Sequence, residues 1–134
     1  MKLNWIRNAA VAALIGYALI VAAPAWAAVT DYDFQLVQSE IKKGDSAEIA
    51  VRLIDKRTGK AVPEAVIFAQ RIDMAPDGME GMTSSIEALP STEPGVYRFK
   101  INLTMAGGWR LSLGAKVQSE TGTLENRLTF KAVP

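Results

Sequence analysis

The stretch that decides the fold is Val-Tyr-Arg-Phe-Lys-Ile-Asn-Leu, residues 96–103. Along it, every second side chain from Tyr97 to Leu103 is large and apolar, and the side chains between them are charged or polar. Successive side chains of a β-strand point to opposite faces, so an alternation of period two predicts a strand with one buried face. We therefore expect residues 96–103 to cross the core of a β-sheet protein.

The same alternation recurs along the rest of the chain. Turn-forming segments with glycine or proline separate the repeats, for example Glu93-Pro94-Gly95 and Gly107-Gly108. No segment with helical periodicity appears after residue 28. Seven short strands at this spacing predict an all-β fold, an immunoglobulin-like antiparallel β-sandwich with Greek-key connections. The predicted strands cover residues 33–38, 48–53, 65–72, 84–89, 96–103, 109–113 with its continuation to Val117, and 123–131.

The first 27 residues have the three parts of a secretory signal peptide. Lys2 and Arg7 give a positive start, an uncharged run covers residues 9–23, and Ala25-Trp26-Ala27 supplies the small residues of a cleavage site. The apolar run is shorter than the roughly 20 residues that a membrane-spanning helix needs. We expect a helical signal peptide at 1–27 and a β-sandwich domain at 28–134, exported to the bacterial periplasm or secreted. The alternative is an uncleaved leader, which would be the chain's one membrane anchor.

Composition excludes several classes of function. The chain has no histidine and no cysteine, which rules out a histidine-activated serine, a cysteine nucleophile, and zinc held by imidazole or thiolate. Without the leader, 13 basic residues stand against 14 acidic ones, because Lys2 and Arg7 are lost from the 15 basic residues of the full chain. That balance does not indicate a nucleic-acid partner. We expect no enzymatic activity and see no sign of a small-molecule substrate.

Methionine is the one residue type with an unusual distribution. Four methionines follow the leader, and three of them, Met74, Met79 and Met82, share the nine-residue window 74–82. Pro76, Gly78 and Gly81 punctuate this window, which predicts a loop. A loop is an unusual place for methionines that serve only to fill a core.

Counting strands brings the fourth methionine to the same end of the sandwich. If residues 84–89 form a full crossing strand, the chain reverses twice between the loop at 73–82 and the loop at 104–108. Two reversals restore the direction, so both loops are predicted at one end. Met105 and the strand-opening Trp109 should then lie near the other three methionines.

A thioether sulfur is soft, uncharged and needs no deprotonation, so a methionine cluster suits Cu(I) or Ag(I). The candidate metal site is therefore Met74, Met79, Met82 and Met105, with the Trp109 indole shielding the ion or contacting it through its face. Two structural alternatives stay open. The methionines can fill the gap between the sheets at an open end, and Trp109 can be a core residue.

Carboxylates in the same loop raise calcium as a further alternative. Asp73, Asp77 and Glu80 could offer oxygen ligands, but their spacing does not match an EF-hand loop. Asp77-Gly78 is also ordinary turn chemistry. The sequence therefore favours a soft ion over calcium.

The ordered combination of several segments resembles the YtkA-like and FixH-like family of bacterial extracytoplasmic domains. The resemblance implies a sandwich fold and a setting near copper or heavy-metal traffic, since FixH-like proteins accompany the assembly of copper-containing respiratory oxidases and related domains accompany metal efflux systems. This chain departs from the membrane-anchored FixH pattern because its leader looks cleavable. The segments are residues 53–55, 58–66, Met74 with Met82, 94–97, and Met-Ala-Gly-Gly-Trp-Arg-Leu at 105–111.

Two functions of different classes follow from these observations. The first is a periplasmic accessory domain that binds or passes Cu(I) or Ag(I) through its methionines, in metal efflux or copper homeostasis. The second is a metal-free envelope module that docks on a membrane transporter or respiratory complex through a strand edge or a loop end.

Overall fold

The structure is a computed structural model that describes residues 29–118 and 120–134. The predicted signal peptide at 1–27 lies outside the described residues. Within the described residues, no helix is long and apolar enough to cross a membrane. The described elements are η2 (Val29–Asp31), β1 (Tyr32–Leu36), β2 (Glu40–Lys42), β3 (Gly44–Asp55), β4 (Lys60–Ala61), β5 (Ala65–Met74), η3 (Ala75–Asp77), β6 (Met79–Ser84), β7 (Ile86–Leu89), β8 (Val96–Leu103), β9 (Gly107–Val117) and β10 (Leu124–Val133).

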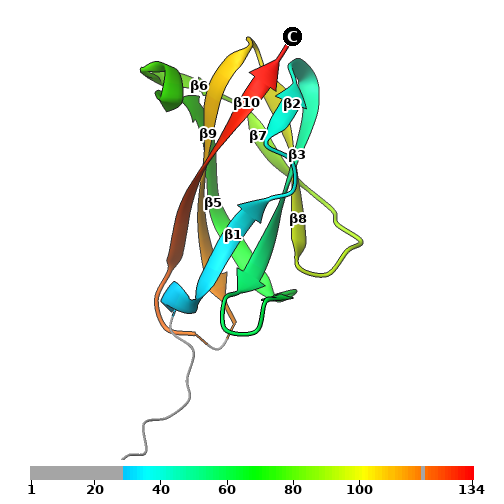
Figure 1. Cartoon of the computed structure of the whole chain (residues 1–134), viewed down its shortest axis with the longest axis vertical. Coiled ribbons are helices and arrows are strands. Elements are labelled where there is room, and N and C mark those ends of the chain that lie inside the picture. The colour runs from blue at the N-terminus through cyan, green and yellow to red at the C-terminus, as the bar shows by residue number, and fades with distance from the viewer. Residues whose placement is uncertain (1–28, 119) are drawn as a thin grey trace, which may run out of the picture.

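The strands form two facing sheets (Figure 1). One sheet has the order β1-β3-β8-β7, with β4 paired to the end of β3, and the other has the order β2-β10-β9-β5-β6. This arrangement confirms the predicted all-β sandwich. The expectation of purely antiparallel pairing is wrong at one place, because β2 runs parallel to β10. The pairing joins the short strand β2 to the C-terminal strand, so the alternation along either strand could not have indicated its direction.

The core lies between the sheets and is built as the alternation predicts. Phe99, Ile101 and Leu103 of β8 are each about 1% exposed, and Trp109 and Leu111 of β9 are fully buried opposite them. Each large apolar side chain buried in this way contributes roughly 1.5–3 kcal/mol. The chain contains no cysteine, so this packing stabilises the domain without disulfide bonds.

The main departure from the predicted strands concerns residues 73–89. The segment 84–89 is not one strand, because the chain leaves one sheet after β6 and enters the other with β7. Much of the expected loop at 73–82 is strand as well, since β6 pairs with the end of β5 at Ile72–Met74. The edge of β5 leaves backbone N–H and C=O groups that need partners, and the returning chain supplies them.

Candidate methionine site at one end of the sandwich

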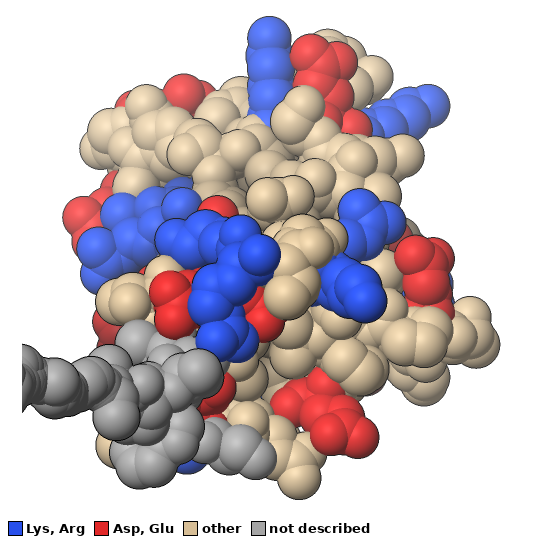
Figure 2. All heavy atoms as spheres, turned by 60° about the horizontal axis from the view of Figure 1, so that its bottom comes forward, with Lys and Arg blue, Asp and Glu red and all other residues tan. Residues whose placement is uncertain are grey.

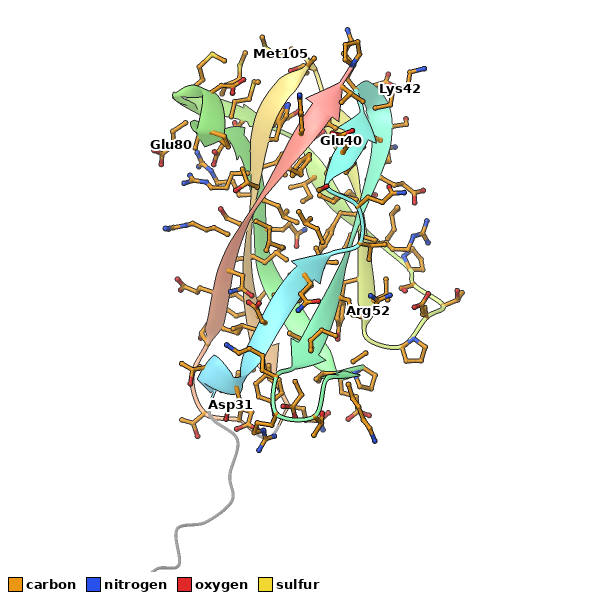
Figure 3. The ribbon with its side chains drawn as sticks, in the orientation of Figure 1. Asp31, Glu40, Lys42, Arg52, Glu80 and Met105 are labelled. Carbon is orange, nitrogen blue, oxygen red and sulfur yellow. The ribbon has the colours of Figure 1, made fainter. Side chains whose placement is uncertain are left out.

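The two predicted loops do meet at one end of the sandwich. The backbone N–H of Gly108 donates a hydrogen bond to Asp77 Oδ2 at 3.1 Å. A β-carbon on Gly107 would overlap the Asp77 carboxylate and lie 3.0 Å from Met74 Cε. The start of β9 is thus packed against η3 and the end of β5. Met105 lies at this end, which is opposite the end that carries Asp31 (Figure 3).

The four methionines divide into one buried residue and three surface residues. Met74 is fully buried and belongs to the hydrophobic core. Met79, Met82 and Met105 are 37%, 40% and 37% exposed. Met79 is the register partner of Met74 across the β5–β6 pair, so their side chains share a face. We call Met79, Met82 and Met105 the methionine rim.

Trp109 lies in the core beneath the rim. Its side chain is fully buried, and its Nε1–H donates a hydrogen bond to the backbone oxygen of Met105 at 3.1 Å. The bond satisfies the one polar atom of the indole and holds the turn before β9 against the core. The core position expected as an alternative for Trp109 is therefore the one observed, and Met74 occupies the same layer.

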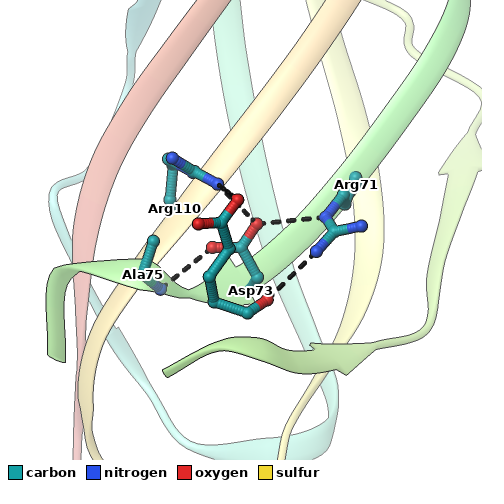
Figure 4. Close-up of polar contacts among 5 residues, drawn as sticks. Arg71, Asp73, Ala75 and Arg110 are labelled. Carbon is teal, nitrogen blue, oxygen red and sulfur yellow. Dashed lines mark hydrogen bonds and ion pairs between the residues drawn. The ribbon is translucent and has the colours of Figure 1, made fainter. Parts of the chain in front are cut away.

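A buried ionic network fixes the end of β5 (Figure 4). The fully buried Asp73 carboxylate accepts hydrogen bonds from Arg71 Nε at 3.1 Å, Arg110 Nη2 at 3.0 Å and the Ala75 backbone N–H at 2.9 Å. Burial by itself raises the pKa of the Asp73 carboxyl, but these three donors outweigh it, so the pKa lies below its usual value. The network ties β5 to β9 and orients the η3 turn that follows Met74.

The same contacts account for the carboxylates considered for calcium. The Asp73 carboxylate forms ion pairs with two arginines, and Asp77 accepts a hydrogen bond from the Gly108 N–H. Glu80 Oε2 lies 3.4 Å from Arg110 Nη2. Among residues 29–118 and 120–134, no group of three or more His, Cys, Asp or Glu side chains is placed to hold a metal ion. The structure thus offers no support for the calcium alternative in the part of the chain that it describes.

Sequence reasoning missed the arginines of this network. One signal was present, because Arg71 and Asp73 are two residues apart in a strand and so share a face. Arg110 could not be found in this way. It reaches Asp73 only because the two residues are register partners across the β5–β9 pair, and that register is a property of the folded sheet.

We compared the chain with known proteins in three ways. A family model described as YtkA-like matches residues 27–114, which is more than half of the 134 residues. One similar solved structure is a ZirS C-terminal domain, with 16% identity and a TM-score of 0.45, and the match covers 92% of this chain and 88% of that one. The search of curated proteins found no match.

Proposed function

This chain belongs to the YtkA-like family, and from that premise we propose that it is an exported, non-enzymatic accessory domain that binds Cu(I) or Ag(I) at the methionine rim. The ion would be held for transfer to or from another envelope protein, in metal efflux or copper homeostasis. Such a setting is the one that the resemblance to FixH-like and related domains implies.

The observation that carries the proposal is the exposure of three thioethers at one end of a rigid fold. Met79 and Met82 come from β6, and Met105 comes from the turn before β9. The Asp77–Gly108 hydrogen bond and the close packing at Gly107 hold η3, which leads into β6, against the start of β9. These contacts support the proposal, because a site built from distant segments needs those segments packed at one end of the fold.

The donor set selects for a soft ion. The chain has no histidine or cysteine, so thioethers are its only soft side-chain ligands. Thioethers suit Cu(I), whereas hard ions prefer oxygen. Because a thioether carries no proton to lose, the affinity of such a site should change little with pH.

Met74 and Trp109 have a different role in the proposal. Both are fully buried directly beneath the rim segments, where Met74 pairs with Met79 in register and Trp109 bonds to the Met105 carbonyl. They form an apolar floor that keeps water from the inner side of the site. We assign ion contact to Met79, Met82 and Met105, and support from below to Met74 and Trp109.

The surroundings of the rim fit a site that hands its ion to a partner. Because the rim lies at the end opposite Asp31 (Figure 3), it faces away from the point where the described chain begins, whether or not the leader is removed. At the opposite end of the domain, which is turned forward in Figure 2, basic and acidic side chains lie beside one another.

The test is a titration of the exported chain with Ag(I), and with Cu(I) in competition with a colorimetric chelator. Replacing Met79, Met82 and Met105 together with leucine keeps side-chain volume and apolarity but removes the sulfurs, so we expect at least about a tenfold loss of affinity, equivalent to about 1.4 kcal/mol. Phe68→Leu is the matched control, because Phe68 is exposed on β5 away from the rim. Equal affinity in the triple variant and the control would refute the proposal.

The same titration distinguishes the metal-binding function from the metal-free alternative. Exposed methionines also make adaptable contacts with protein surfaces, so the rim could serve an envelope module that docks on a transporter or respiratory complex. In that case the unmodified chain would show no saturable Ag(I) binding, while the leucine variant would still compete for the partner. Saturable binding that disappears with the sulfurs supports the metal function.

A further inference from the structure

The outer face of the sheet β2-β10-β9-β5-β6 carries two neighbouring rows of side chains. One row is basic, and the other contains an acidic and an aromatic side chain. The register of β9 with its two neighbours defines the rows. Ser112 lies between Arg71 of β5 and Arg127 of β10. Two residues further along β9, Gly114 lies between Ala69 of β5 and Glu125 of β10.

A β-bulge adds an aromatic side chain to the second row. The register of β5 with β9 shifts between Ile67 and Ala69, so Phe68 is an extra residue opposite Gly114. A β-carbon on Gly114 would lie 3.3 Å from the Phe68 ring, and the ring is 59% exposed. Val66, two residues before it, is 66% exposed. Two large apolar side chains thus stand on the surface of β5.

The centre of this face is hollow. Phe68, the two arginines and Glu125 surround a shallow depression whose floor is Ser112, Gly114 and Ala69. Small side chains at the middle of a sheet face let another backbone approach closely. The face therefore has a raised aromatic side chain at one edge and little side-chain bulk at its centre.

The charges around the depression are complementary under a two-fold rotation. The two-fold axis lies between the two copies, parallel to their sheets and perpendicular to the strands, and it passes between the two rows, so each row of one copy lies opposite the other row of the second copy. Glu125 of one copy then faces Arg127 of the second copy, Phe68 faces the second copy's Arg71, and Gly114 faces its Ser112. Within the described residues, neither Glu125 nor Arg127 has a side-chain hydrogen-bond or ion-pair partner.

We propose that this face binds a second copy of the chain in a symmetric, face-to-face dimer. Two Glu125–Arg127 ion pairs and two guanidinium–ring contacts between Arg71 and Phe68 hold the copies together. The rows that follow on either side bring Arg110 opposite the second copy's Lys116. Arg110 is already neutralised by Asp73 and Glu80, so this contact does not oppose the dimer.

The dimer leaves the methionine rim free. Because the axis is perpendicular to the strands, the two copies run in opposite directions and their rims lie at opposite ends of the assembly. The proposal is independent of metal binding, since none of its contacts involves a rim residue. Its test is therefore carried out in metal-free buffer.

The experiment measures the mass of the exported chain by sedimentation equilibrium over a wide concentration range. A contact that rests on two ion pairs and two ring contacts gives a weak dimer, so concentrations up to about 300 µM are needed. Phe68→Ser should raise the dimer Kd at least about tenfold. Glu125→Arg alone and Arg127→Glu alone should each weaken the dimer, because each places like charges opposite one another. Val37→Ser is the control, since Val37 is an exposed apolar residue outside this face.

Mixing the two charge variants supplies the decisive measurement. The Glu125→Arg chain presents two arginines and the Arg127→Glu chain presents two glutamates, so an equimolar mixture should form a heterodimer with restored affinity. A wild-type chain that stays monomeric at every concentration would overturn the proposal. So would a dimer that the Phe68 and charge variants leave unchanged, or a mixture that shows no rescue.

Discussion

Gly107→Ala is the substitution that tests most directly how the rim is held together. Gly107 opens β9 with φ at +139°, a conformation that L side chains rarely adopt. A methyl group there would also overlap the Asp77 carboxylate and press on Met74 Cε. The alanine variant must therefore distort the backbone and push Asp77 away from β9 at the same time.

The cost of this change can be worked from its two parts. A residue other than glycine in such a backbone region costs about 1–3 kcal/mol. Displacing Asp77 also breaks its hydrogen bond to the Gly108 N–H, which is exposed and so contributes about 1 kcal/mol. Together these give a loss of about 3 kcal/mol, a large fraction of the roughly 5–15 kcal/mol by which a domain is stable.

Urea denaturation followed by tryptophan fluorescence or circular dichroism measures the loss. With an m-value of about 1–3 kcal/mol per molar urea, the midpoint should fall by about 1–3 M. Gly122→Ala is the matched control, because Gly122 has φ at +92° but open space around it. It reports the backbone cost without the clash. Gly81→Ala has neither feature and should leave the midpoint nearly unchanged.

The comparison of Gly107→Ala with Gly122→Ala tests whether Gly107 is packed against Asp77. Gly107→Ala should cost at least about 1 kcal/mol more than Gly122→Ala, the share that belongs to Asp77 and its hydrogen bond. Asp77→Ala should cost less in the Gly107→Ala background than in the unmodified chain, because the alanine at position 107 has already broken the Asp77–Gly108 hydrogen bond. Equal midpoints for the two glycine variants would show that Gly107 is not packed against Asp77 and Met74 as described.

Two further changes test other parts of the structure. Asp73→Asn removes the counter-charge of Arg71 and Arg110 and should cost about 3 kcal/mol in urea unfolding. The folded pKa of Asp73 lies below its unfolded value of about 3.9. The carboxylate's contribution to stability is therefore complete above about pH 3.9 and is lost as the pH falls through the folded pKa. The Asn variant should lack this acid-dependent loss of stability. Tyr97→Phe removes a hydroxyl that donates to the Val62 carbonyl and accepts from the Ala65 N–H, which should lower the urea midpoint by the equivalent of about 1 kcal/mol, and an unchanged midpoint would contradict those bonds.

Sequence reasoning succeeded where a pattern is local. The alternation at 96–103 predicted the bounds of β8, and the strands at 48–53, 65–72, 109–117 and 123–131 lie within or nearly within β3, β5, β9 and β10. It failed at residues 73–89, because β6 forms by pairing with the end of β5 rather than by any alternation of its own.

For the candidate site, too, the local features were predictable and the features that depend on distant contacts were not. That Met74, Met79 and Met82 share a short window is visible in the chain. Counting strands gave the correct end for Met105 from a wrong premise, because residues 84–89 are not one crossing strand and β6 and β7 make the crossing together. The sequence could not show that Met74 fills the core while the other three reach the surface. Whether a side chain at the end of a strand is buried depends on whether the opposite sheet covers it. The position of that sheet depends on contacts between residues far apart in the chain.

The sequence by itself determined the fold class and the range of chemistry, because period-two alternation and the absence of histidine and cysteine are properties of the chain alone. Only the tertiary structure decided which methionines are exposed, which arginine faces Asp73, and which side chains share the outer face with Phe68. These depend on strand register, and register is set by long-range pairing and by bulges, so a strand's own residues carry too little information to specify it.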